Sequence, residues 1–150
     1  MKSLENEQKL FMFNSVSRML KNKNIPVNDT AMRPIQQAGN YFENVVEAMH
    51  SIIEKESYDF SVKDLRKILE FNGYQFTSED ETQQKEELEK AIKDFRKYSM
   101  RLSELEDEPK RFFSDESRVK EISYFFENMG NFYQRLVEEE DFHEIATSDD

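Results

Sequence analysis

The chain contains no cysteine and no tryptophan, and it has only three glycines, three prolines and two histidines among 150 residues. The absence of cysteine excludes disulfides and cysteine-ligated zinc or iron–sulfur sites. The longest early apolar run, residues 10–13, is too short for a signal peptide or a membrane span. No glycine-rich phosphate loop and no Ser/His/Asp arrangement is present. We therefore expect a cytoplasmic protein that needs no cofactor.

A basic excess is also lacking, since the formal net charge is −11. Residues 79–108 carry 11 acids and 6 bases, and residues 137–150 carry 7 acids and no base, whereas residues 1–78 are neutral. Such a field disfavours nucleic acid and anionic membranes and favours a basic protein partner. Within residues 79–108 we expect Glu86, Glu89, Asp94 and Arg96 to lie on a solvated helix face with i, i+4 ion pairs.

Apolar residues at helical spacing are the main pattern that is present. They predict five helices, over residues 3–23, 31–56, 61–72, 79–107 and 115–143. Short connections predict an all-α, mostly antiparallel bundle with the second and fifth helices at its centre. The 13 Phe and 6 Tyr argue against disorder. We expect one domain over residues 1–145, a left-handed helix stop at Gly73, and a frayed acidic tail over residues 146–150.

Two of the three glycines begin near-copies of one nine-residue phrase, Gly39–Glu47 and Gly130–Glu138. Glycine inside a helix costs about 1 kcal/mol relative to alanine, so it usually has a packing or functional reason. We predict that the two helices cross at Gly39 and Gly130, because bare backbone lets helices approach closely. The aromatic residues expected around the crossing are Tyr41, Phe42, Phe132 and Tyr133. A ligand pocket between these aromatic pairs is the alternative.

Both histidines close a Glu-x-x-His spacing, at Glu47–His50 and Glu140–His143. This is the ligand spacing of di-iron carboxylate bundles. Glu47, however, lies opposite the apolar stripe of its helix, and the second pair lies at a helix end that would enclose a metal poorly. We therefore predict no metal site and no catalytic residue. A carboxylate–histidine metal enzyme is the least favoured alternative.

Two features point to interaction surfaces. The first is acidic and comprises Glu79, Asp80 and Glu81 with Glu138, Glu139, Glu140 and Asp141. The second is a spare apolar row, Leu4 and Phe11, on a helix that already has another apolar stripe. Each has a simpler explanation, which is solubility for the acids and a second core contact for the apolar row.

These features favour a small helical regulator or inhibitor without catalytic activity. It would use its acidic segments to attract a basic partner protein and its aromatic residues to anchor that partner. The alternatives are an acidic inhibitor that mimics DNA and a structural subunit that self-assembles through the first helix. No direct contact with nucleic acid or membrane is expected, and a homodimer is compatible with the sequence.

Overall fold

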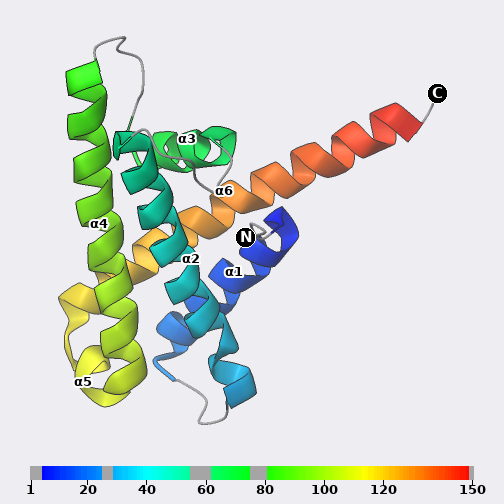
Figure 1. Cartoon of the computed structure of the whole chain (residues 1–150). Coiled ribbons are helices and arrows are strands. Elements are labelled where there is room, and N and C mark those ends of the chain that lie inside the picture. The colour runs from blue at the N-terminus through cyan, green and yellow to red at the C-terminus, as the bar shows by residue number, and fades with distance from the viewer. Residues whose placement is uncertain (1–4, 25–28, 55–61, 75–80, 149–150) are drawn as a thin grey trace. The chain divides into compact units, whose positions relative to one another are not determined.

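The computed structural model describes residues 5–24, 29–54, 62–74 and 81–148, and every regular element in these ranges is an α-helix (Figure 1). The helices are α1, Asn6–Asn22; α2, Asp29–Glu54; α3, Val62–Phe71; α4, Glu81–Asp107; α5, Pro109–Ser114; and α6, Glu116–Ser148. The predicted all-α class is thus confirmed. Five of the six helices lie close to the ranges expected from the apolar periodicity.

The short helix α5 is the one that the periodicity does not predict. Pro109 follows the end of α4 and occupies the first turn of α5. Proline is well suited to this position, because its missing N–H would have no partner inside the helix in any case. Phe112 buries its ring and accepts a hydrogen bond from the Asp115 N–H (3.1 Å). The last helix also extends further than predicted, because residues 146–148 continue α6.

The Cα positions divide the chain into two compact units. Unit 1 contains Gly39–Glu104, and unit 2 contains Leu4–Ala38 together with Leu105–Asp150. Both boundaries fall inside helices, so α2 and α4 each begin in one unit and end in the other. The prediction of one domain, and of which helices are central to it, stays a prediction.

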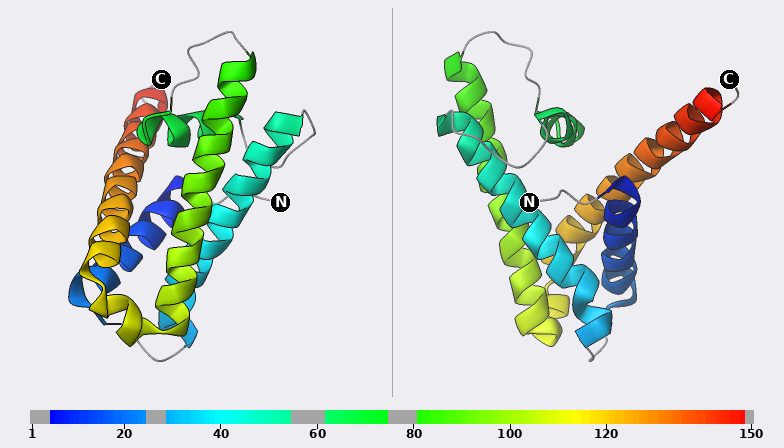
Figure 2. Two further views of the ribbon diagram at one scale, coloured as in Figure 1. Left: turned by 90° about the vertical axis from the view of Figure 1, so that its left-hand side faces the viewer. Right: turned by 45° about the vertical axis from the view of Figure 1, so that its right-hand side comes forward.

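In unit 2, α1 lies against α6, which is one continuous helix (Figure 2). The contacts step backwards along α6 as α1 proceeds, from Lys9 near Tyr133 to Lys21 near Glu127 (4.0 Å), so the two helices are antiparallel. The centre of this packing is Phe13, whose ring stacks on Tyr133 with centroids 5.6 Å apart. The core of unit 2 also holds Lys9, which is almost completely buried.

The two glycines of the repeated phrase have different surroundings. A Cβ atom added at Gly130 would lie 2.6 Å from the Asn14 side-chain oxygen, so the bare backbone of α6 admits a residue of α1. At Gly39, no atom of the described residues other than its chain neighbours and the adjacent backbone of α2 lies within 4 Å of the corresponding position. Gly130 therefore makes a close approach to α1 within unit 2, and the predicted crossing of the two helices at their glycines stays a prediction. The similarity of the two phrases does not extend to their packing.

In unit 1, α4 packs on the later part of α2 through aromatic residues, and it also contacts the end of α3. The Phe42 ring of α2 lies 5.7 Å from Phe95 and 6.4 Å from Tyr98, both on α4. The Tyr74 hydroxyl, just after α3, donates a hydrogen bond to the Asp94 carboxylate. Asp94 was expected on a solvated face with ion pairs, but it instead holds the end of α3 against α4.

Among the described residues, two helices end in a left-handed residue, of which one is glycine. Gly73 (φ 86°) ends α3, where its N–H bonds to the Glu70 carbonyl (3.0 Å) and the Tyr74 N–H bonds to Leu69 (2.7 Å). This is the stop expected from the sequence. Lys23 (φ 52°) ends α1 in the same manner. A side chain makes this conformation costly, whereas glycine adopts it freely.

Opposite substitutions at these two ends should therefore have opposite effects. Gly73→Ala should lower the free energy of unfolding by about 1 kcal/mol, and Lys23→Gly should raise it by about 0.5 kcal/mol. Urea denaturation of each variant beside the parent protein measures both values. Shifts of the same sign would contradict the explanation from left-handed backbone.

Candidate partner-binding groove

Helix α1 exposes an aromatic side chain next to buried ones. Met12 and Phe13 are fully buried, whereas Phe11 is 62% exposed. Phe11 was singled out from the sequence because it lies off the main apolar stripe of its helix. Its partner in that row, Leu4, lies outside the described residues. The exposure shows that Phe11 is not the second core contact that was the simpler explanation.

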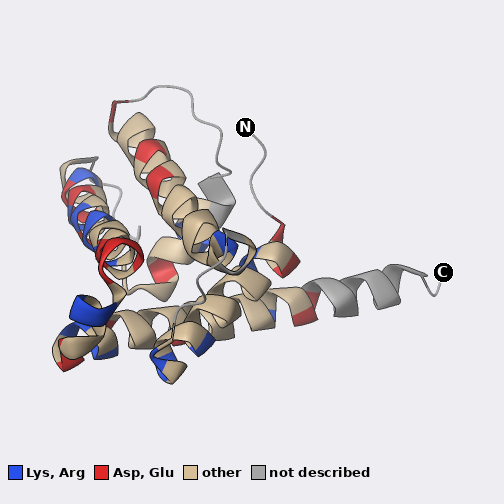
Figure 3. Cartoon of the chain, turned by 90° about the horizontal axis from the view of Figure 1, so that it is seen from below, with Lys and Arg blue, Asp and Glu red and all other residues tan. Residues whose placement is uncertain are grey.

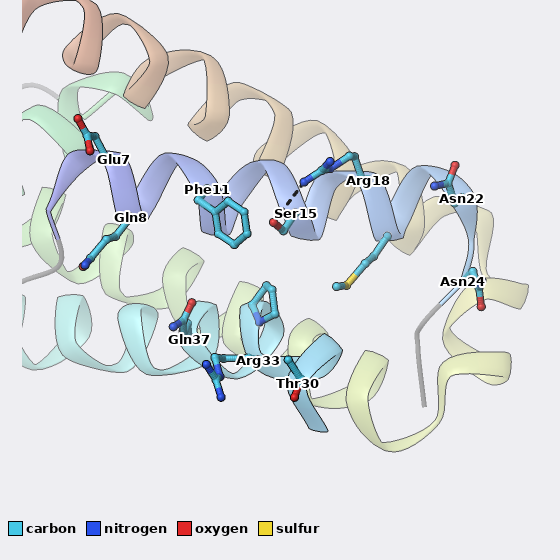
Figure 4. Close-up of a pocket in the computed structure, with 12 residues that line it drawn as sticks. Glu7, Gln8, Phe11, Ser15, Arg18, Asn22, Asn24, Thr30, Arg33 and Gln37 are labelled. Carbon is cyan, nitrogen blue, oxygen red and sulfur yellow. Dashed lines mark hydrogen bonds between the residues drawn. The ribbon is translucent and has the colours of Figure 1, made fainter. Parts of the chain in front are cut away.

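Phe11 lines a hollow between α1 and the first turns of α2, entirely within unit 2 (Figure 4). We call this hollow the Phe11 groove, and its volume is about 990 Å³. Its walls are formed by Glu7, Gln8, Phe11, Ser15, Arg18, Met19, Asn22, Asn24, Thr30, Arg33, Pro34 and Gln37. The volume is at the upper end of the range typical of ligand pockets.

The Phe11 groove has apolar residues at its centre and polar or charged residues at its ends. Phe11, Met19 and Pro34 supply apolar surface, on which the side chain of a partner can be buried. Arg18 donates a weak hydrogen bond to the Ser15 hydroxyl (3.5 Å), which directs its guanidinium along α1. Arg33 extends from α2 on the other wall (Figure 4). Both arginines are exposed and can meet a ligand.

A second hollow in unit 2 shares one residue with the Phe11 groove. Asn24 lines both, and we call the second one the Lys23 hollow. It measures about 940 Å³ and is lined by Lys23, Asn24, Glu108, Pro109, Lys110, Arg111, Phe113 and Ser114. Arg111 forms an exposed ion pair with Glu108 (3.2 Å). The short helix α5, which the sequence pattern missed, supplies most of this hollow.

Most of the predicted acidic surface falls outside what the structure describes. Glu79 and Asp80 lie outside the described residues, as do the side chains of Glu81, Glu140 and Asp141. Glu138 and Glu139 are exposed on α6, and Glu138 accepts a hydrogen bond from Gln134 (3.1 Å). Along α4, acidic and basic residues interleave (Figure 3). Binding of a basic partner at the acidic segments stays a prediction.

The two histidines do not form a described metal cluster. The Arg96 guanidinium lies 2.8 Å from His50 Nε2, and arginine can only donate, so this contact fixes His50 Nε2 as the acceptor. The side chain of His143, like that of Glu140, lies outside the described residues. Among the side chains that the structure places, no three His, Asp or Glu groups converge on a point that could hold a metal ion.

Of the residues expected at a helix crossing, each aromatic pair lies within one unit. Tyr41 and Phe42 contact each other edge to face in unit 1 (5.8 Å), and Phe132 and Tyr133 do so in unit 2 (5.1 Å). Phe42 and Tyr133 then pack on α4 and α1 respectively. Tyr41, Phe42 and Tyr133 are buried in the cores of their units, whereas Phe132 is half-buried.

The sequence pattern identified Phe11 but not the residues around it. Arg18, Arg33 and Pro34 carry no signal of their own in a helical periodicity, because their positions are ordinary for exposed or first-turn residues. Their convergence depends on how α1 and α2 pack, which the periodicity of each helix alone does not determine.

Comparison with protein-family models, with curated proteins and with solved structures found no match to this chain. None of the described helices combines the length and the apolar character that crossing a membrane requires. The interpretation of function therefore rests on the geometry of the groove.

Proposed function

We propose that this chain is a non-catalytic protein-binding module, acting as a regulator or inhibitor, that takes a side chain or short segment of a partner protein into the Phe11 groove. The observation that supports this proposal is the exposure of Phe11 inside a hollow. Covering the exposed part of a phenylalanine contributes about 1–2 kcal/mol. Aromatic residues seated in a pocket and shielded from water are the usual anchors of protein interfaces.

The surroundings of Phe11 support binding of a protein segment. Its neighbours supply apolar surface through Met19 and Pro34, and hydrogen-bonding groups through Gln8, Asn22 and Gln37. A hydrophobic centre with a polar rim is the common composition of protein interfaces. The polar side chains of the rim can form hydrogen bonds with the backbone of a bound segment, while the apolar centre contacts its side chain.

Removing the Phe11 ring should weaken capture of the partner at least tenfold, because tenfold corresponds to about 1.4 kcal/mol. The experiment is a pull-down from the native cells with the parent protein and with Phe11→Ala, with quantitative mass spectrometry of the bound proteins. The matched control is Tyr124→Ala, which removes an even more exposed aromatic residue (71%) from α6.

A protein that the parent and Tyr124→Ala retain, but that Phe11→Ala loses, supports the proposal. The bait proteins are compared at equal concentration of folded protein, so that a difference in folding cannot change the recovery. The exposed Phe11 ring should contribute little to stability, so we expect this adjustment to be small. Equal recovery of every bound protein by Phe11→Ala and by the parent would contradict the proposal.

A further inference from the structure

The charge around the Phe11 groove is opposite to that of the chain as a whole. Five cationic residues line the Phe11 groove and the adjoining Lys23 hollow, and these are Arg18, Lys23, Arg33, Lys110 and Arg111. The acidic residues there are Glu7 and Glu108, of which Glu108 is paired with Arg111. A protein of net charge −11 thus presents a locally basic surface around the apolar Phe11 groove.

The charges are also ordered along the groove. Figure 4 shows Glu7 and Gln8 at one end, Phe11 near the middle with Arg33 across from it on the α2 wall, and Arg18 beyond Phe11. Asn24 lies at the far end and leads to the Lys23 hollow, which is also basic. A ligand whose apolar group rests on Phe11 therefore meets Arg33 on the opposite wall and Arg18 towards the Asn24 end, whereas Glu7 lies at the other end. This polarity can fix the direction in which a segment binds.

We propose that the Phe11 groove binds an acidic segment of its partner protein, with an apolar side chain on Phe11 and carboxylates directed to Arg18 and Arg33. This inference rests on the proposed function and adds the chemistry of the partner. Guanidinium groups bind carboxylates through paired, charge-assisted hydrogen bonds. Complementary charge sets orientation and suppresses wrong partners. The partner expected here is thus acidic at the contact, whereas the sequence pointed to a basic partner at other segments.

An acidic peptide suits this surface better than a nucleic acid does. The centre of the groove is apolar, with Phe11, Met19 and Pro34, and it provides little to bind a sugar–phosphate backbone. Nucleic acids carry closely spaced phosphates over a long distance, and the net charge of −11 repels such a polyanion. A short segment with a few carboxylates meets the local basic surface and little of the remaining field.

The test is to select, from a library of displayed random peptides, those that bind the full chain. The parent protein should enrich peptides that have a large apolar residue with Asp or Glu close to it in the sequence. The double variant Arg18→Glu, Arg33→Glu should enrich Lys or Arg at the same positions. A matched control, Lys85→Glu with Lys93→Glu, makes the same change of net charge at exposed positions in unit 1 and should select as the parent does.

Binding of one enriched peptide is then measured by titration calorimetry. We expect a loss of affinity of at least tenfold in the Arg18→Glu, Arg33→Glu variant, and weaker binding as salt screens the charges. Urea denaturation of each variant verifies that it is folded.

The outcomes separate this inference from the proposed function. Peptides that depend on Phe11 but show no charge preference would overturn the acidic segment while leaving the binding module intact. If no enriched peptide depends on Phe11, both proposals are wrong. A single-stranded DNA oligonucleotide that displaces the peptide at physiological salt would also overturn the inference in favour of a nucleic-acid ligand.

Discussion

Phe13→Ala should lower the free energy of unfolding by about 3–5 kcal/mol, the range typical of a buried phenylalanine reduced to alanine. Phe13 has no exposed surface, and its ring stacks on Tyr133 while also lying 5.4 Å from Phe126. The substitution leaves a cavity at the centre of the packing between α1 and α6. Because domains are stable by only about 5–15 kcal/mol, this loss removes much of the stability. Urea denaturation followed by circular dichroism measures it.

Phe11→Ala is a matched control, since it makes the same chemical change two residues earlier on the same helix. Phe11 is mostly exposed, so its removal should change the free energy of unfolding by no more than about 0.5 kcal/mol. The pair thereby distinguishes burial from helix propensity. A loss below about 1 kcal/mol for Phe13→Ala would show that α1 does not pack on α6 as described.

Phe42→Ala should have an effect of similar size in unit 1, again about 3–5 kcal/mol. The Phe42 ring is fully buried and contacts three other rings, of Tyr41, Phe95 and Tyr98. Aromatic pairs contribute beyond the area that they bury, so several such contacts are lost together. Denaturation gives the total loss, and amide hydrogen exchange gives its location. We expect the largest loss of protection in α4, which carries two of the three rings.

Phe42→Leu provides the comparison for this second prediction. Leucine keeps most of the apolar volume but no aromatic ring, and such conservative changes usually cost less than about 1.5 kcal/mol. Equal losses for the alanine and leucine variants would mean that ring geometry, and not the cavity, dominates. A fully protected α4 in Phe42→Ala would contradict the aromatic packing of unit 1.

The helices could be predicted from the sequence because each depends on local information. The apolar stripe that contains Phe13, Val16 and Leu20 indicates both the existence of α1 and the face that it buries. Gly73 indicates the end of α3, because glycine adopts the left-handed backbone conformation at the lowest cost in free energy. Lys23 plays the same role without any such signal. The short helix α5 could not be predicted, because its six residues are too few to show a helical period.

The partners of each helix could not be predicted in the same way. Gly130 signals a close approach, but nothing in the phrase specifies that Asn14 of α1 fills the space. Asp94 and Arg96 have the spacing of solvated ion-pair residues, yet they contact Tyr74 and His50 from other elements. Phe11 could be recognised as unusual from its position on the helix. The positive charge of its groove depends on Arg18 of α1 and Arg33 of α2, which come together only through the packing of the two helices.

The division of the chain inside α2 and α4 limits how this protein could have arisen and how it could be re-engineered. The junction at residues 38–39 lies well inside α2 and that at residues 104–105 lies in the last turn of α4, so neither falls in a linker that could be cut. One residue inserted at either junction would turn the rest of that helix by about 100° and advance it by about 1.5 Å. We expect single insertions and deletions to be tolerated least at these two points. Gene fragments ending there would divide α2 and would remove the last turn of α4.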